Sequence, residues 1–188
     1  YFSGVISSKN DNDIKAEQYL SKVQSLQNIH SNYNIEFVRT LVLLEKFDRA
    51  LVFSKNVWNE NELFFEADLL LGLDFFIKKE FKKAEKHFKR LNEISRYNLY
   101  FKDFIGNILI MWSKASQGKK NESFNLLTEI PEQYRHLKNT QISFLKCYFD
   151  SPDTQNSFQE LIQSKDYNFS RYNFFLINYL IFNNKDSQ

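Results

Sequence analysis

Small residues recur along this chain at a fixed spacing. Two series share a step of about 34 residues: Ala16, Ala50 and Ala84, and Gly4, Val38, Gly72 and Gly106. A period of about 20 to 50 residues is typical of chains built from stacked units that cannot bury their apolar faces alone. The sequence therefore predicts a repeat protein in which each unit packs against its neighbours in the chain.

The repeating unit is clearest over residues 67–91, where two amphipathic helices are expected one after the other. Leu71, Gly72 and Phe75 fall on one face of the first helix, and Ala84, Phe88 and Leu91 fall on one face of the second. Phe81 stands at the turn between them. The small residues at positions 72 and 84 would let the two helix axes approach closely, so we expect a helix hairpin as the repeated element.

The pattern within this unit resembles the tetratricopeptide repeat family, whose units have the same length of about 34 residues. The match is to L-G-x2-[YF]…[YF]-x2-A-x3-F-x2-[AL], carried by Leu71, Gly72, Phe75, Phe81, Ala84, Phe88 and Leu91. The third repeat matches well and the other repeats are degenerate. The resemblance implies an all-α fold, a right-handed α-α superhelix of helix hairpins, over residues 1–188 as a single solenoid.

Repeat boundaries follow from the spacing. We expect repeats over approximately residues 1–29, 30–60, 61–95, 96–134 and 135–168, then a C-terminal helix over 170–183. The expected helices cover residues 1–9, 14–26, 34–45, 48–58, 62–78, 81–94, 99–116, 122–130, 137–149, 153–162 and 171–182, with Ser170 as the N-cap of the last. Ser123 lies five positions beyond the place that one repeat step from Ala84 predicts. That place is Gly118, in a polar turn, so we expect an insertion of five residues before Ser123.

Composition favours a helical protein and excludes several other classes. Gly (4) and Pro (2) are scarce, which disfavours loop-rich β folds, and a single cysteine excludes an intrachain disulfide. No apolar run reaches the roughly 18 residues that span a bilayer. The net charge of +2 is too small to indicate nucleic acid or membrane binding by itself.

No constellation of residues predicts catalysis or a bound cofactor. His30, His87 and His136 lack metal-ligand spacing, and we expect them to be solvated. Cys147 has no recognisable base in the sequence, so we expect it to pack between helices. We expect a non-enzymatic protein with no metal and no cofactor.

A basic stripe runs along the helix predicted over residues 81–94. Lys78, Lys82 and Lys86 are four residues apart, with Lys79, Lys83, Lys89 and Arg90 beside them, although Glu80 and Glu85 interrupt the positive charge. Such a stripe could bind RNA or an anionic surface. The simpler reading is a solvated helix face, which we prefer.

The resemblance also implies a binding groove. In the family, the first helix of each repeat lines a concave face that holds a peptide segment. The corresponding residues here are Asn32, Ile35, Arg39 and Val42; Glu66, Leu69, Leu73 and Phe76; Tyr100, Asp103, Asn107 and Ile110; and Asn139, Ile142, Lys146 and Phe149. Some relatives hold a terminal carboxylate with a Lys and an Asn four residues apart. No such pair occurs at these positions, which disfavours that mode.

These observations predict an interaction scaffold that binds a protein or peptide partner in the groove. Three alternatives stay open. The groove could be filled by other parts of the same protein, the chain could be a regulatory or structural arm of a larger enzyme or assembly, or the Lys stripe could bind RNA or an anionic surface. The chain begins at Tyr1, and we expect a fragment of a longer protein. The abundance of Lys, Asn, Ile and Phe fits an AT-rich, bacterial genome, with a cytoplasmic or periplasmic location left open.

Overall fold

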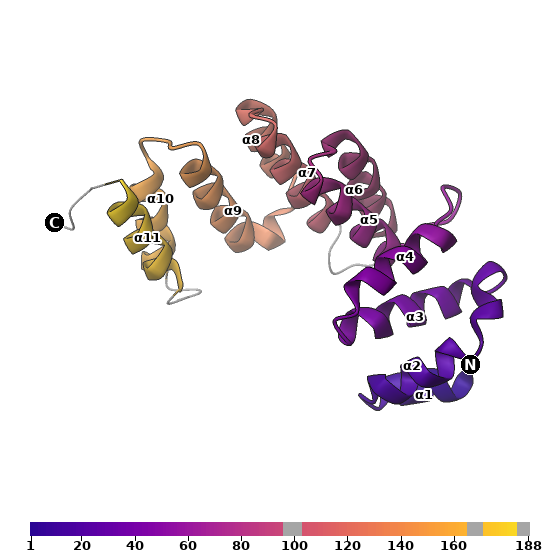
Figure 1. The fold of residues 1–188 in the computed structure, drawn as a ribbon. Coiled ribbons are helices and arrows are strands. Elements are labelled where there is room, and N and C mark those ends of the chain that lie inside the picture. Colours follow the sequence, from indigo (N-terminus) through magenta and orange to yellow (C-terminus); the bar gives the residue numbers. More distant parts are fainter. Residues whose placement is uncertain (96–102, 165–170, 184–188) are drawn as a thin grey trace. The chain divides into compact units, whose positions relative to one another are not determined.

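The computed structural model describes residues 1–95, 103–164 and 171–183 (Figure 1). All regular structure in these ranges is helical: α1 (Phe2–Lys9), α2 (Asp13–Ser21), η1 (Gln24–Asn28), α3 (Ser31–Leu43), α4 (Phe47–Val57), α5 (Phe65–Ile77), α6 (Phe81–Ser95), α7 (Ile105–Ser116), α8 (Lys120–Thr128), η2 (Glu132–Tyr134), α9 (Arg135–Tyr148), α10 (Thr154–Gln163) and α11 (Arg171–Phe182). The all-α, helical-repeat fold predicted from the sequence is confirmed for these residues.

Helices that are adjacent in sequence pack in pairs. The hairpins are α1–α2, α3–α4, α5–α6, α7–α8 and α9–α10. Within each compact unit, the second helix of a hairpin also contacts the next first helix, as α4 contacts α5 and α10 contacts α11. The chain divides into two compact units, residues 1–102 and residues 103–188. The expectation of one unbroken stack concerns how these units are arranged, and it stays a prediction.

Most predicted helix positions agree with the structure, and α11 has the predicted bounds. The second helix is shorter than expected: α2 ends at Ser21, and residues 24–28 form a separate 3₁₀ turn. The fifth helix begins at Phe65 rather than at Glu62. Ser170 and the expected start of the seventh helix at residue 99 lie outside the described residues.

The small residues of the repeat lie where helices meet. Ala16, Ala50 and Ala84 are fully buried. A Cβ atom added to Gly72 would stand 2.7 Å from Cδ1 of the Phe88 ring, far inside van der Waals contact, and closer still to Cε1. The close approach of α5 and α6 predicted from Gly72 is therefore confirmed, and Phe88 fills the space that the missing side chain leaves.

Each hairpin turns through the same main-chain arrangement. The turn residues Asp11, Glu45, Lys79, Gly118 and Asp150 all have positive φ, between 46° and 75°. The residue after each one donates its N–H to a carbonyl five residues back, for example Glu80 N to Phe75 O at 2.9 Å and Lys119 N to Lys114 O at 3.0 Å. This is the Schellman motif, which satisfies helix carbonyls that otherwise lack partners.

These turns show where the extra residues of the fourth repeat lie. Gly118 is the turn equivalent of Lys79, yet it comes five positions later than one repeat step places it. The end of α7 at Ser116 is late by the same five positions, counted from the end of α5. The five additional residues therefore precede the end of α7. The equivalent of Gly72 is Met111, which is fully buried, and not Gly106.

Candidate binding surfaces

The predicted groove residues of the N-terminal unit lie on two successive first helices. On α3, Asn32 and Arg39 are exposed, and Ile35 and Val42 are half-buried. On α5, Leu73 is exposed, and Glu66, Leu69 and Phe76 are half-buried.

An ion pair links these two sets. Arg39 Nε donates to Glu66 Oε1 at 2.6 Å, and Glu36 Oε1 lies 3.7 Å from the same guanidinium. Two residues predicted to share a surface are therefore in contact across α3 and α5. This group combines one cation with two carboxylates.

The fourth-repeat residues are displaced by the shifted alignment. Asn107 and Ile110 are buried, each 5% exposed, and Asp103 precedes the first residue of α7. Tyr100 lies outside the described residues. With Met111 at the position of Gly72, the groove positions of this repeat become Ile105, Ile108, Trp112 and Ala115. Trp112 is half-buried, and its Nε1 donates to Gln141 of α9 at 2.9 Å.

In the fifth repeat, Asn139 is exposed and Lys146 is half-buried on α9. Ile142 and Phe149 are also half-buried and pack against the core of α7, α8 and α9. Lys146 Nζ lies 2.7 Å from Asp153 Oδ2, and this hydrogen bond lowers the pKa of Asp153. Of this set, Asn139 is the residue that lies at a cavity.

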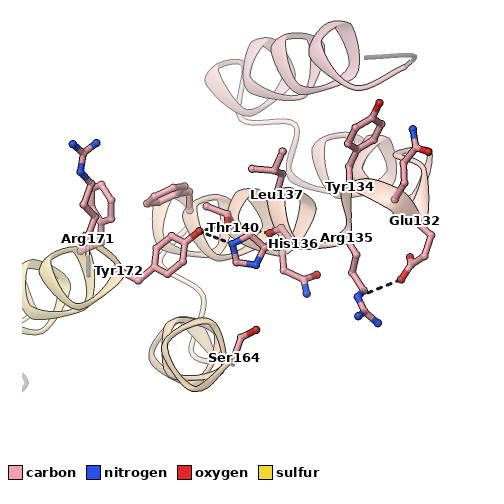
Figure 2. A pocket seen from close by; sticks show the side chains of 13 residues that line it. Glu132, Tyr134, Arg135, His136, Leu137, Thr140, Ser164, Arg171 and Tyr172 are labelled. Atoms are coloured by element: carbon pink, nitrogen blue, oxygen red, sulfur yellow. Dashed lines mark hydrogen bonds and ion pairs between the residues drawn. The ribbon is translucent and has the colours of Figure 1, made fainter. Parts of the chain in front are cut away.

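That cavity has a volume of about 850 Å³ and lies between α9, the end of α10 and α11. Leu137 and Phe144 of α9 and Phe175 of α11 supply apolar walls, and Arg135 and Arg171 add positive charge. Figure 2 shows Arg135 directed toward Glu132, with Nε 3.5 Å from the carboxylate. The volume of the cavity lies within the range of about 300 to 1,000 Å³ that is usual for ligand pockets.

A chain of hydrogen bonds crosses this pocket. The Tyr172 hydroxyl on α11 lies 2.9 Å from Thr140 Oγ1 and 3.1 Å from His136 Nε2, both on α9 (Figure 2). Thr140 Oγ1 also donates to His136 O at 3.0 Å. These bonds hold α11 against α9 and place a hydroxyl and an imidazole at the base of the pocket.

A buried polar cluster stands between α5 and α6, and sequence reasoning missed it. Asp68 is fully buried, and its Oδ1 accepts from Trp58 Nε1 at 2.8 Å and from Arg90 Nε at 2.9 Å. His87 Nδ1 lies 2.9 Å from the same oxygen. The signal was present, because the helical phase that buries Ala84 and Leu91 also places His87 on the buried face.

Arg90 extends from this cluster to the loop that precedes α5. Its guanidinium donates to Glu60 O at 2.6 Å and to Glu62 O, and its Cζ lies 5.2 Å from the Trp58 ring centroid. The loop carbonyls are thereby satisfied by a side chain, which explains why α5 begins later than predicted.

His87 is not solvated as we expected, whereas His30 and His136 are half-buried. His87 is 6% exposed, and its ring stacks on Phe75 at 5.5 Å. His30 is the N-cap of α3, where Nδ1 accepts from Tyr33 N at 3.0 Å. All three histidines make hydrogen bonds within the protein: His30 caps α3, His87 bonds Asp68, and His136 bonds Tyr172.

Three lysines of this basic region, Lys78, Lys83 and Lys86, are paired with carboxylates. Lys78 lies 2.8 Å from Asp74, Lys83 lies 2.5 Å from Glu80, and Lys86 lies 2.6 Å from Glu60. Arg90 is buried and does not belong to the exposed stripe. These pairs reduce the positive field that a polyanion would meet.

Cys147 is half-buried and packs against the core of Phe158, Leu161 and Tyr172. Burial, with a smaller contribution from Asp150, raises the pKa of its thiol. The packing role that we expected for this residue is confirmed, and a raised pKa lowers the fraction of reactive thiolate.

Within the described ranges, no cluster of three or more His, Cys, Asp or Glu residues could hold a metal ion. The helices there are also too short or too polar to cross a membrane. No family model matches the sequence, and a search of curated proteins finds no significant match.

Proposed function

We propose that this chain is a non-catalytic, tetratricopeptide-like scaffold that binds a peptide segment of a partner protein on the faces of its first helices. The observation that carries the proposal is the open pocket at α9, which contains the predicted groove residue Asn139. A cavity of about 850 Å³ is large enough for one or two peptide side chains.

In the C-terminal unit, the pocket would act as an anchor. Leu137, Phe144 and Phe175 would enclose an apolar or aromatic side chain, while the amide of Asn139 would bond the main chain of the peptide. The Tyr172 hydroxyl and the His136 ring already bond one another, so they would add orientation at little cost in side-chain entropy.

In the N-terminal unit, the same kind of segment would lie along α3 and α5. Leu73 offers an apolar contact, and the Arg39–Glu66 pair offers both a donor and an acceptor. Because the pair is exposed on the Arg39 side, a partner could exchange it for its own charged groups without burying an unpaired ion.

To test this function, peptides that bind the full chain are selected from a displayed random library. Their affinity is then measured for the wild type and for variants. We expect Leu73→Glu or Leu137→Glu to weaken the selected peptides by about tenfold or more, as loss of an apolar anchor does. Leu73 is preferred to Phe76, which packs on Phe81 at 5.7 Å. The matched control is Val52→Glu, an exposed apolar position on the second helix α4. Equal affinity for all three variants would contradict the proposal.

A further inference from the structure

The helix α11 is apolar on nearly every side. Its sequence, RYNFFLINYLIF, has one charged residue, Arg171. Tyr172 and Tyr179 are buried, whereas Phe174 is 63% exposed and Ile181 is 70% exposed. A helix that is apolar all round is normally covered on all sides.

The repeat spacing shows which face of α11 is uncovered. Counting back from Phe174 by the repeat steps gives residues that are all buried, namely Thr140, Gly106, Ala67 and Tyr33. Counting back from Asn178 on the same face gives the half-buried Phe144, and then Ile110, Leu71 and Phe37, none of these three more than 5% exposed. The exposed face of α11 is therefore the face that is covered in the earlier first helices.

In two hairpins, the second helix contacts this face of the first helix. Phe37 on α3 meets Phe53 on α4 edge to face at 4.9 Å. Phe144 on α9, at the same repeat position, meets Phe158 on α10 at 5.8 Å. These contacts define a helix-on-helix interface within the chain, and the exposed face of α11 continues it.

The second helices share a simple pattern on the side that packs. Each carries a buried small residue: Ala16, Ala50, Ala84, Ser123 or Ser157. Four of the five carry a large apolar residue four positions later: Leu20, Phe88, Leu127 and Leu161. Residues four apart lie on one helix face, so the small residue permits close approach and the large one fills the adjoining space.

We propose that the exposed face of α11 is a docking site for an amphipathic helix of a partner protein, bound as a second helix would be. The partner helix carries a small residue and, four residues later, a large apolar residue. An apolar hollow of about 450 Å³, lined in part by Cys147, Phe158 and Ile181, receives the large side chain. Because the face is almost uncharged, the attraction is apolar and independent of salt.

A peptide with the sequence of α6, residues 81–95, is a suitable probe because it carries Ala84 and Phe88. We expect fluorescein-labelled peptide to bind the full chain in an anisotropy titration, with equal affinity at low and high salt. Replacement of Phe88 by Asp within the peptide should abolish binding. On the protein, Ile181→Asp should weaken binding by about tenfold or more, because the new carboxylate faces the bound helix.

Ile14→Asp is the matched control, since Ile14 is similarly exposed but lies on α2. Circular dichroism confirms that each variant is folded, and Phe174→Asp provides a second variant of the same face. Absence of peptide binding, or equal binding by Ile181→Asp, overturns the inference. So does a dimer of the unliganded chain that Ile181→Asp converts to a monomer, because the face would then serve a second copy. The hollow shares Phe144 and Phe175 with the pocket at α9, but Ile181 and Phe174 do not line that pocket and Leu73 and Leu137 do not line the hollow. The variants of the two tests are therefore different, and either proposal can fail alone.

Discussion

The carboxylate of Asp68 and the guanidinium of Arg90 meet in the interior of the N-terminal unit. Arg90 Nε lies 2.9 Å from Oδ1 and 3.0 Å from Oδ2, and the Arg90 and Asp68 side chains are 10% and 0% exposed. Trp58 and His87 bond the same carboxylate. One acidic side chain thus joins α4, α5 and α6 at a single point.

We expect Asp68→Asn to lower the free energy of unfolding by about 3 to 5 kcal/mol, because it leaves the Arg90 charge buried without its counter-ion. Urea denaturation followed by circular dichroism measures the change. The matched control is Glu66→Gln, which removes a pair exposed on the Arg39 side and should cost less than about 1 kcal/mol. Similar losses in both variants would show that the buried Asp68–Arg90 pair contributes no more to the free energy of unfolding than the exposed pair does.

The hairpin turns predict opposite effects of glycine at two equivalent positions. Gly118 has a φ of 75° with no atom within 4 Å of an added Cβ, so Gly118→Ala should cost about 1 kcal/mol through backbone strain alone. Lys79 has a φ of 61° and an exposed side chain, and Lys79→Gly removes that strain. We expect Lys79→Gly to raise the unfolding free energy or leave it unchanged. Thermal denaturation of the wild type and the variant measures the difference. A loss as large as that of Gly118→Ala would contradict the explanation.

The contact of Gly72 with Phe88 predicts overpacking. Gly72→Ala places a methyl group against a fully buried ring, and we expect a loss of about 1 to 3 kcal/mol in unfolding free energy. The double variant Gly72→Ala with Phe88→Leu should be more stable than the sum of the two single losses. Strict additivity in a double-mutant cycle would show that the two residues do not compete for space.

Glu17 on α2 predicts an acid-sensitive link between the first two hairpins. The hydrogen bond from Lys46 is the main cause that lowers the pKa of Glu17 below its usual 4.5, and Arg49 adds to it. A carboxyl group whose pKa is lowered by folding stabilises the protein above its unfolded-state pKa, and this stability is lost as the pH falls through the folded-state pKa. From about pH 6 to about pH 3, wild type should therefore lose more unfolding free energy than Glu17→Gln. Parallel pH profiles in urea titrations would contradict this.

The repeat spacing predicted most of the helices because it depends on residues that must be buried. Ala16, Ala50 and Ala84 mark contacts between the helices of a hairpin, and any larger side chain there would separate them. The fourth repeat was misaligned because Gly106 happens to lie one repeat step after Gly72. Its true equivalent, Met111, belongs to the same core cluster as Leu127, a smaller partner than Phe88. The larger side chain of the contact can therefore lie on either helix, and the spacing of small residues alone does not reveal which helix carries it.

The buried cluster around Asp68 could not be predicted from a local motif, because Trp58, His87 and Arg90 come from different helices and from a helix end. Asp68 did carry a signal, since it is an acidic residue four positions before Gly72 on an otherwise apolar face. The pocket at α9 could not be predicted from the sequence either. It depends on the distance between α9 and α11, which Tyr172 fixes through Thr140 and His136.

The corners of the first three hairpins are closed by main-chain hydrogen bonds around Asp11, Glu45 and Lys79, which are interchangeable surface side chains. Such corners are natural places to cut and rejoin the gene. An engineer could duplicate or graft the segment between two of them, which consists of the second helix of one hairpin and the first helix of the next, and leave the contacts between those two helices unaltered.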